Sequence, residues 1–497
     1  MILALAGCVA PQYVAAPTSA PAVVLLGQLG PGSVTIEGVL EGDTRIDVDR
    51  GADDRYGFRF RVVDRGGDTL VERATVGPSL VLSFLDYWSG VSGIDILHTV
   101  PSLGRFPLVI PVLPEADEIV FQLRDAGGEW VDAGRWSYDA LDDPRIAPSI
   151  EPVAVTPLVV ASDPGVDPLD LVILSDGYTA DELELFAADA DKVARSVLDV
   201  EPFRSYAPRI SITRVDVPSP QSGASFDCDT CGYVENAFGS IFPIELVNRL
   251  SGSAYDTRSM FQADQWKVVE ALAHVPWDAV VVLVNSDKFG GMAVHHASVT
   301  RGVGDIGPTA VHELGHSFGL LGDEYVADAC VRTPAFPLPE NVTDQPQAPP
   351  WAPFVDPGAP LPTEPGDGVE VGAFAGAWNC DDLYRPSEVC RMNEGHGPFC
   401  AACAELVTRR LLRFDDPAGE VWLEDRRVRA RALLPDTEAV LVVDGVELGR
   451  GAVDALPRLP AGASEVDVTL EWRPEAVRTD PTHDLRETWS FREPEEP

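Results

Sequence analysis

The residues of this chain best suited to chemistry lie in one short segment around two histidines. His312, Glu313 and His316 have the spacing HExxH. On a helix, residues four apart lie on the same face, so both imidazoles can reach one metal ion. Two neutral histidines with a carboxylate beside the metal-bound water are typical of zinc hydrolases, in which that carboxylate is the general base. The alternative is a pair of ordinary histidines on a helix surface.

A third zinc ligand is expected shortly after this helix. Gly319 would let the chain leave the helix, and Asp323 and Glu324 follow within a few residues. One carboxylate would complete a site that leaves one position for water, with Asp323 as the first choice and Glu324 as the second. The other carboxylate could hold a ligating imidazole by its free N–H. Both could instead serve as helix caps or ion-pair partners.

Four segments of the chain resemble a known family. Residues 312–325 are similar to the signature of the bacterial IgA-peptidase family of zinc metalloendopeptidases. Three more segments are similar to that family in order and spacing: residues 174–182, 214–219 and 383–393. The resemblance covers about residues 168–414 and implies a metzincin-like fold, with a central twisted sheet and a methionine-containing turn beneath the zinc. Met392 matches that methionine.

The third ligand departs from the pattern of ordinary metzincins. In those proteins the ligand would fall at Gly322, which has no side chain. The ligand must therefore move to Asp323 or Glu324, which the IgA-peptidase signature also carries.

These residues support the attack of water on a peptide carbonyl. Zinc would lower the pKa of its bound water, and Glu313 would take the proton and pass it to the leaving amine. A further donor should stabilise the oxyanion; Tyr384 and His396 are candidates, and each also has a structural interpretation. The predicted function is a zinc-dependent endopeptidase that acts on protein substrates. The alternative is a surface adhesion protein with a vestigial peptidase domain, which the intact HExxH segment opposes.

Strand and helix patterns alternate ahead of the histidines. Apolar runs predict strands at three positions: residues 169–175, 209–217 and 279–285. Amphipathic spacing predicts helices at residues 182–198 and 262–274, and Thr179 with Glu182 forms a capping box before the first of them. This alternation indicates an α/β layer, which leads into the zinc-binding helix at residues 308–318.

Residues 290–300 predict a short strand at the edge of that layer. In many zinc peptidases the sheet edge over the cleft pairs with an extended substrate, and this segment is well placed to do so. His295 and His296 lie within it. Because a strand sends neighbouring side chains to opposite faces, we expect these histidines on the surface rather than together in a cleft.

The remaining sequence predicts β-rich domains on both sides of the catalytic one. Alternating apolar residues and hairpin turns indicate a β-sandwich at residues 28–147, followed by a proline-rich linker at residues 148–167. The zinc metallopeptidase domain would occupy residues 168–415, and an immunoglobulin-like β-domain residues 416–497. The predicted fold class is multidomain α+β, with a metzincin-like α/β peptidase domain flanked by N-terminal and C-terminal β-sandwich domains.

Composition and charge restrict the class of partner. The 497 residues suffice for two or three domains, and 43 glycines with 43 prolines favour β-structure and loops. The formal net charge of −42 would repel nucleic acid and anionic membrane surfaces. We therefore expect a monomer that acts on protein or peptide substrates, with no nucleic-acid partner. No apolar run is long enough to span a membrane.

The first residues indicate export. Leu5-Ala6-Gly7-Cys8 resembles a bacterial lipoprotein cleavage box, and a Pro/Ala/Ser-rich tether would follow to residue 27. The apolar run is short and no Lys or Arg precedes it, so a start further upstream and a coincidence both stay open. We predict an extracellular or cell-surface location, with any membrane attachment through lipid on Cys8.

The other seven cysteines lie in the central part of the chain. They include two CxxC pairs, Cys228 with Cys231 and Cys400 with Cys403. Such pairs suit a structural zinc site, but disulfides are the favoured interpretation in an exported protein. We expect Cys330 to pair with Cys380 across a proline-rich loop, and Cys390 to pair with Cys400 or Cys403.

Overall fold

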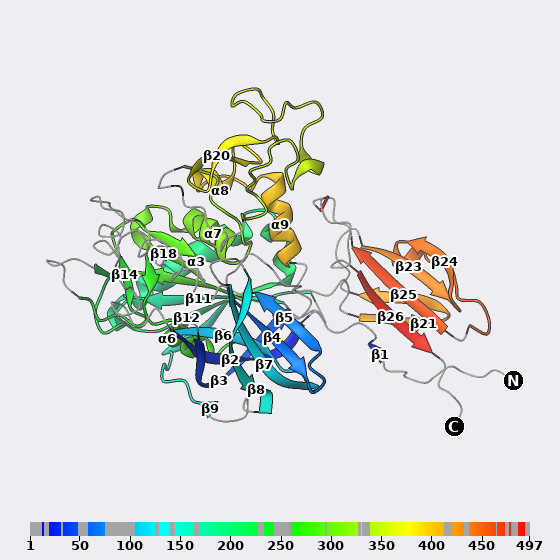
Figure 1. The fold of residues 1–497 in the computed structure, drawn as a ribbon, viewed down its shortest axis with the longest axis horizontal. Coiled ribbons are helices and arrows are strands. Elements are labelled where there is room, and N and C mark those ends of the chain that lie inside the picture. The colour runs from blue at the N-terminus through cyan, green and yellow to red at the C-terminus, as the bar shows by residue number, and fades with distance from the viewer. Residues whose placement is uncertain are drawn as a thin grey trace.

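The computed structural model is a mixed α+β fold, built mostly of strands with few helices (Figure 1). The structure describes residues 12–13, 19–30, 33–47, 58–74, 105–124, 129–139, 145–163, 168–226, 233–242, 258, 260–293, 296–326, 330, 338–411, 420–431, 437–463, 465–472, 477–478 and 486–492. The predictions for Cys8, Cys228, Cys231 and His295 lie outside these residues.

A six-stranded sheet forms the centre of the domain that carries the HExxH segment. Its strand order is β10-β12-β11-β16-β18-β17. The four inner strands are parallel, and each edge strand runs antiparallel to its neighbour. The strands are β10 Ala154–Val159, β11 Leu169–Asp176, β12 Ile210–Asp216, β16 Ala279–Val284, β17 Gly291–Ala293 and β18 Ala297–Thr300.

This sheet is covered on both faces because its inner strands are apolar on both sides. The main helices are α3 Leu183–Leu198, α6 Gln265–Leu272, α7 Ile306–Ser317 and α9 Ala401–Leu411. Helices α3, α7 and α9 share one core with Ile173 and Val281 of the sheet. Helix α6 packs on the opposite face, against Val172 and Val282. The predicted α/β layer is therefore confirmed, with element bounds within a few residues of those expected.

Strand β10 lies inside the segment that we expected to be a linker. It pairs with β12 from Ala154 to Val159, with an irregular register after Pro157. Proline cannot donate a ladder hydrogen bond, so it is confined to edge strands and bulges, and β10 is such an edge. The proline content indicated extended chain correctly, but the extended chain belongs to the sheet. The prediction of a free linker over residues 148–167 is wrong for this strand.

Two four-stranded sheets precede the central sheet. Their orders are β6-β2-β3-β9 and β5-β4-β7-β8, and they share one core. The strands are β2 Ser19–Gly30, β3 Ser33–Asp47, β4 Phe58–Asp64, β5 Thr69–Ala74, β6 Arg105–Pro111, β7 Ala116–Arg124, β8 Trp130–Ser137 and β9 Arg145–Ile146. Val24 and Leu26 of β2 also contact the core on the α6 face of the central sheet.

Strand β2 corrects the predicted start of this domain. Residues 19–27 were expected in a flexible tether, but they pair with both β3 and β6. Val24, Leu25 and Leu26 are buried there. The Pro/Ala/Ser-rich composition before them concealed an apolar strand, so the boundary at residue 28 is too late.

The segment after α7 contains short elements that surround the end of that helix. They are η6 Ala352–Phe354, β19 Phe374–Ala377, β20 Cys380–Arg385 and α8 Arg391–Glu394. The predicted disulfide between Cys330 and Cys380 is present. Smaller elements elsewhere are η3 Ala180–Glu182, α4 Phe203–Tyr206, η4 Ala207–Arg209, β13 Ser225–Phe226, β14 Ser240–Phe242, β15 Phe261–Gln262 and η5 Arg301–Val303.

The C-terminal strands form a body of their own, drawn in orange and red beside the rest of the molecule in Figure 1. One sheet has the order β1-β26-β25-β23-β24, and β21 pairs with β22. Both contribute to one core. The elements are β1 Gln12–Tyr13, β21 Glu420–Glu424, β22 Arg427–Arg431, β23 Thr437–Val443, β24 Val446–Gly451, η7 Val453–Ala455, β25 Glu465–Trp472 and β26 Arg486–Arg492. Across the part of the chain that the structure describes, no helix has the length and apolarity to cross a membrane.

Candidate metal centre

Helix α7 carries the HExxH segment. Two glycines in close contact with their neighbours determine how α7 packs and where it ends. A Cβ on Gly315 would lie 2.6 Å from the sulfur of Met392, so only glycine fits there. A Cβ on Gly319 would lie 2.7 Å from the carbonyl oxygen of Gly315. The chain turns away at Leu320, whose φ is 54°. Gly319 is therefore required because the backbone of Gly315 approaches it closely, and the left-handed conformation occurs one residue later, at Leu320.

His312, His316 and Asp323 converge on one point. The Nε2 atoms of the two histidines are 3.2 Å apart, and each lies 3.2 Å from Oδ1 of Asp323. The two imidazole rings meet edge to face, with centroids 4.8 Å apart. Among the described residues, these three side chains form one of the clusters able to hold a metal ion, and Glu324 is not part of it.

The other nitrogen of each imidazole fixes the tautomer. Nδ1 of His312 lies 2.9 Å from the carbonyl oxygen of Arg391, and Nδ1 of His316 lies 2.7 Å from that of Leu321. A carbonyl only accepts, so both Nδ1 atoms carry the proton. In the neutral form of both rings, Nε2 therefore carries the lone pair, and both lone pairs face the point where the Asp323 oxygen also arrives. Backbone carbonyls behind ligating histidines are the usual means of orienting such rings.

The geometry and charge of this triangle fit a small divalent cation. Tetrahedral ligands about 2.0–2.1 Å from a zinc-sized ion are about 3.3 Å apart, close to the separations observed here. Oδ1 of Asp323 is buried and accepts no well-aligned hydrogen bond from the described residues. Burial would lower the pKa of His316, but the carboxylates of Asp323 and Glu313 raise it to about 9. The same negative charges would stabilise a metal cation.

The backbone around Asp323 is held on both sides. Asn341, which is fully buried, donates to the carbonyl oxygen of Gly322 at 2.9 Å and accepts from its N–H at 2.8 Å. The N–H of Trp378 donates to the carbonyl oxygen of Asp323 at 2.9 Å. These bonds come from distant parts of the chain, so the loop after α7 has one defined path. That path directs the Asp323 carboxylate at the histidines.

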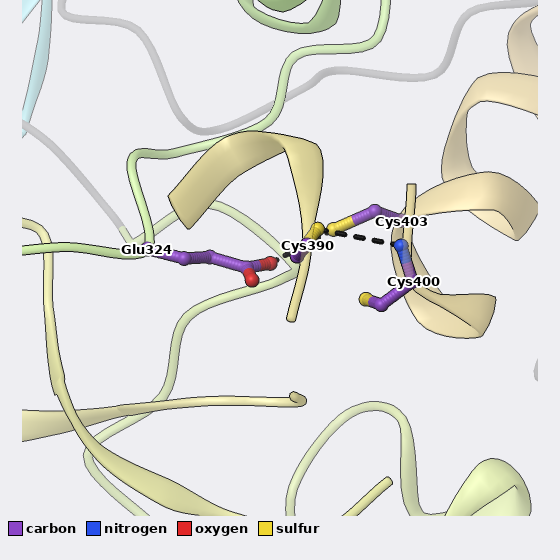
Figure 2. Close-up of side chains that lie close together, drawn as sticks. All are labelled: Glu324, Cys390, Cys400 and Cys403. Atoms are coloured by element: carbon purple, nitrogen blue, oxygen red, sulfur yellow. Dashed lines mark hydrogen bonds between the residues drawn. The ribbon is translucent and has the colours of Figure 1, made fainter. Parts of the chain in front are cut away.

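Glu324, the second choice for the third ligand, lies on the other side of this loop. Its Oε1 accepts from Nδ2 of Asn341 at 3.0 Å and from the thiol of Cys403 at 2.9 Å. The predicted disulfide of Cys390 with Cys400 or Cys403 is wrong, because all three are free thiols. Instead of pairing, their sulfur atoms gather around the Glu324 carboxylate (Figure 2).

The turn that contains Met392 packs beneath α7, as the family resemblance implies. The Met392 side chain is fully buried, and its sulfur lies against Gly315. Its carbonyl oxygen accepts from the N–H of Glu324 at 2.8 Å. The guanidinium of Arg391 donates to the carbonyl oxygen of Pro308 at 3.0 Å. The turn therefore contacts both the helix and the loop that follows it.

Glu313 lies outside the triangle and faces the edge of the central sheet. Burial raises the pKa of its carboxyl, and the charge of Asp323 raises it further. A Cβ on Gly291 of β17 would lie 2.3 Å from Oε1 of Glu313, so glycine is needed there. One short strand was predicted over residues 290–300; the structure instead has two antiparallel strands there, β17 and β18, with β17 at the sheet edge.

His296 does not lie on the surface, so that prediction is wrong. It is buried after β17, and its Nε2 lies 2.6 Å from Oε1 of Gln262. Gln262 also accepts from the hydroxyl of Ser298 at 2.7 Å. A polar partner from a distant segment satisfies the ring, and no feature of residues 290–300 alone indicates that partner.

Tyr325 is a site residue that the sequence reasoning did not single out. Its ring stacks on that of His312, with centroids 6.5 Å apart. Burial raises the pKa of its hydroxyl, and the neighbouring carboxylate of Asp323 raises it further. Its position two residues after Asp323 was the available signal. Two other residues, Tyr384 and His396, were predicted from the sequence as oxyanion donors. His396 is exposed, and the backbone of Tyr384 pairs with Thr343 at the β20 hairpin.

A comparison with protein families gives a match over the segment that carries this site. A family model described as IgA Peptidase M64 matches residues 158–368, which include β11, the whole of α7 and the loop through Asp323. These residues belong to the IgA peptidase M64 family. The family indicates a metallopeptidase, in agreement with the converging histidines and carboxylate. No curated protein gives a significant match to the chain.

The M64 match ends before several residues that complete the site. Met392 and the three free cysteines lie beyond residue 368. They contact the matched part directly, through Gly315 and Glu324 respectively. The structural unit around the metal centre is therefore longer than the matched segment.

Proposed function

We propose that this chain is a zinc-dependent endopeptidase in which His312, His316 and Asp323 hold the metal and Glu313 is the general base. The observation that carries the proposal is the triangle of two Nε2 atoms and one Oδ1 atom, 3.2 Å on each side. Imidazole and carboxylate ligands suit Zn²⁺, and three protein ligands leave a fourth position for water. The M64 match supports a peptide bond as the target.

The chain's own residues would divide the steps of hydrolysis between them. When bound, zinc lowers the pKa of a coordinated water and polarises the substrate carbonyl. Glu313 takes the proton as that water attacks the carbonyl carbon, and then delivers it to the leaving amine. The raised pKa of Glu313 makes its carboxylate a stronger base, as a group that takes a proton from water needs to be. The Tyr325 hydroxyl, beside Asp323, is our candidate donor to the oxyanion.

The edge strand β17 supports an extended peptide substrate. It pairs on one side with β18, and among the described strands it has no partner on the other. An edge strand can add a substrate strand through backbone hydrogen bonds. Gly291 brings this strand close to Glu313, so a paired peptide would pass the general base. We therefore propose that the enzyme binds unfolded or loop segments of protein substrates.

The wider setting forms part of the same proposal. The parallel sheet, the HExxH helix and the buried methionine support a metzincin-like catalytic domain. The paired sheets with shared cores support β-sandwich domains on either side of it. The Leu5-Ala6-Gly7-Cys8 segment and the disulfide between Cys330 and Cys380 support export to the cell surface or the extracellular space. We propose that the enzyme acts there, on extracellular proteins.

Metal content and cleavage together test the proposed function. Purified chain should contain zinc and should cleave casein in a reaction that a chelator abolishes and zinc restores. Glu313→Ala should keep its metal and its thermal midpoint but lose about 10²-fold or more in cleavage rate. Asp323→Ala should lose zinc as well as cleavage, whereas Asp191→Ala, an exposed change on α3, should alter neither.

The competing function is a surface binding protein with an inactive peptidase domain. That function would be favoured by protein that contains no zinc at the histidines and shows no chelator-sensitive cleavage. Full cleavage by Glu313→Ala would instead exclude Glu313 as the base while leaving the metal site intact.

A further inference from the structure

A second group of metal-binding side chains lies behind the catalytic ligands. It consists of Glu324, Cys390, Cys400 and Cys403, which we call the thiol cluster. One ligand atom from each residue lies within 4.8 Å of the other three, and all four residues are buried. Figure 2 shows the Glu324 carboxylate and the sulfur atoms of Cys390 and Cys403 directed toward one another, with Cys400 beside them.

The thiol cluster has the sequence spacing of a structural zinc site. Cys400 immediately precedes α9 and Cys403 lies in its first turn, so this CxxC pair is presented by a helix start. Cys390 immediately precedes α8, ten residues earlier. The N–H of Cys400 lies 3.4 Å from the sulfur of Cys390 and donates to it. A CxxC pair with further ligands from a separate turn is a common way to hold zinc.

The thiol cluster brings the Glu324 carboxylate together with three thiols that can lose a proton. No cation is among their described hydrogen-bond partners. Glu324 is fully buried; its Oε1 accepts from Cys403 and Asn341, and its Oε2 accepts no hydrogen bond from any described group. A buried carboxylate with an unsatisfied oxygen is costly unless a cation compensates it. Arg385 lies close enough to act on Glu324 electrostatically, but its guanidinium donates to backbone carbonyls, including that of Ser387 at 3.2 Å.

A disulfide accounts for this arrangement less well. It would use two of the three thiols and leave the third beside the carboxylate, with Oε2 of Glu324 still unsatisfied. A metal ion uses all four side chains at once. Iron–sulfur clusters are held as a rule by four cysteines, and this group supplies only three. Three thiolates and one carboxylate suit Zn²⁺, whose thiolate ligands are about 3.8 Å apart in a tetrahedron, within the 4.8 Å limit of this group.

We propose that the thiol cluster is a second, structural zinc site, closed by four protein ligands and separate from the catalytic one. Its position gives it a mechanical role. Glu324 follows Asp323 directly, and Cys390 precedes Arg391, whose carbonyl oxygen orients His312. Zinc in the thiol cluster fastens the loop that carries the third catalytic ligand to the turn that orients the first. The site does not require the proposed peptidase activity, so each can be tested without the other.

Metal content distinguishes the two sites. Protein produced with zinc, with the Cys330–Cys380 disulfide intact, should contain about two zinc ions per chain. Cys400→Ser/Cys403→Ser should lower this by one, and His312→Ala/His316→Ala should lower it by one independently. Cys228→Ser/Cys231→Ser is the matched control and should keep both ions. The proposal is overturned if the Cys228/Cys231 variant loses the second zinc and the Cys400/Cys403 variant keeps it, or if only the histidines bind zinc.

A spectroscopic measurement avoids dependence on whether the Cys400/Cys403 variant folds. The chain carrying Cys228→Ser/Cys231→Ser and His312→Ala/His316→Ala is loaded with Co²⁺ in place of zinc. Thiolate ligands should give a thiolate-to-cobalt charge-transfer absorption, which nitrogen and oxygen ligands alone do not. Absence of that absorption would overturn the proposal. Peptide mapping of the native chain would do the same if it found a disulfide between any two of Cys390, Cys400 and Cys403.

Discussion

Asp323 and Glu324 are adjacent carboxylates with opposite surroundings. The Asp323 carboxylate lies beside two imidazoles, whereas the Glu324 carboxylate lies beside three thiols. Outside a helix, neighbouring side chains can leave the backbone on opposite sides, so adjacent residues can belong to different sites. The sequence narrowed the third ligand to these two residues from their distance after the helix. It ranked Asp323 ahead of Glu324 but left the third ligand open, because the choice depends on Asn341 and the Met392 turn, which are distant in sequence.

Tyr325→Phe tests whether the Tyr325 hydroxyl takes part in the reaction. That hydroxyl lies beside Asp323, and the Tyr325 ring stacks on His312, so Tyr325→Phe removes a donor while keeping most of the ring contact. We expect kcat to fall about 10- to 100-fold with little change in KM, because an oxyanion donor acts mainly in the transition state. Steady-state kinetics with a peptide substrate would measure the two constants separately.

The metal content of Tyr325→Phe is the control for that measurement. It should match the parent chain, since tyrosine is not among the converging ligands. A variant with normal kcat would exclude the hydroxyl from the reaction. A variant that loses zinc would show that Tyr325 positions Asp323 instead.

The HExxH spacing allowed the histidines and Glu313 to be predicted without the structure, because a helix alone brings such residues together. Tyr325 and Gly291 could not be predicted in the same way. Tyr325 reaches the site only because the chain folds back after Leu320. Gly291 reaches it because β17 packs against α7. Both contacts arise from tertiary structure.

The capping box lies at the start of η3, the short turn that leads into α3, and its strength can be tested by pH. The predicted pairing of Thr179 with Glu182 is present: Oε2 of Glu182 accepts from the backbone N–H of Thr179 at 2.9 Å, and Oε1 accepts from the Ser222 hydroxyl at 2.9 Å. Burial alone would raise the pKa of Glu182, but these donors lower it below the ordinary 4.5. A depressed pKa means that the charged form stabilises the folded state above the unfolded pKa.

We therefore expect Glu182→Gln to destabilise the protein at pH 7 by about 0.5–1 kcal/mol, the usual scale of a helix cap. The difference should shrink as the pH falls through the folded pKa, because the parent then loses the same charge. Thermal midpoints from pH 3 to pH 8 would measure this. Asp191→Asn on the exposed side of α3 should show no such trend. A difference that grows toward acid pH would contradict the assignment.

Packing between α7 and the turn of Met392 predicts that Gly315 does not tolerate a larger residue. A Cβ on Gly315 would lie 2.6 Å from the Met392 sulfur, so Gly315→Ala must move the turn or the helix. We expect a loss of about 1–3 kcal/mol in stability, the usual cost of overpacking. Zinc affinity should fall as well, because the same turn supplies the carbonyl oxygen that orients His312.

Chemical denaturation and a competitive zinc chelator would measure the two effects of Gly315→Ala. Ser317→Ala is a suitable control, because it changes the same helix without adding volume. Unaltered stability in Gly315→Ala would mean that the sulfur and the helix are not tightly packed.

The elements that sequence patterns located best are those buried on both faces. Strands β11 and β16 and helix α3 were placed to within a residue or two, since their apolar periodicity reflects one core. Strands β2 and β10 were missed because proline-rich composition hid their pairing; β10 lies at a sheet edge, whereas β2 lies between β3 and β6. Pairing partners are non-local, so composition alone assigned both segments to tether and linker.

In the whole molecule, the N-terminal β-rich part shares a core with the central sheet, whereas the C-terminal β-rich part has a core of its own. Val24, Leu26 and Leu40 of the N-terminal sheets belong to the core on one face of the central sheet. The C-terminal strands have a separate core of their own. A guanidinium–ring contact joins the two sides, with Arg478 5.0 Å from the ring centre of Phe354. Domain boundaries read from sequence do not reveal this asymmetry, since both parts show the same strand pattern.

This asymmetry predicts different outcomes for two truncations. Removing residues 416–497 should leave zinc binding and peptide cleavage close to those of the parent, because the core around α7 and α9 loses none of its members. Removing residues 1–147 should take Val24, Leu26 and Leu40 out of the core on the α6 face and make the chain insoluble or unfolded, since each buried aliphatic side chain contributes about 1.5–3 kcal/mol. Soluble yield, circular dichroism and cleavage of one peptide would compare the two. Equal tolerance of both deletions would mean that the N-terminal sheets are an independent domain, and equal failure would mean that the C-terminal strands support the catalytic fold.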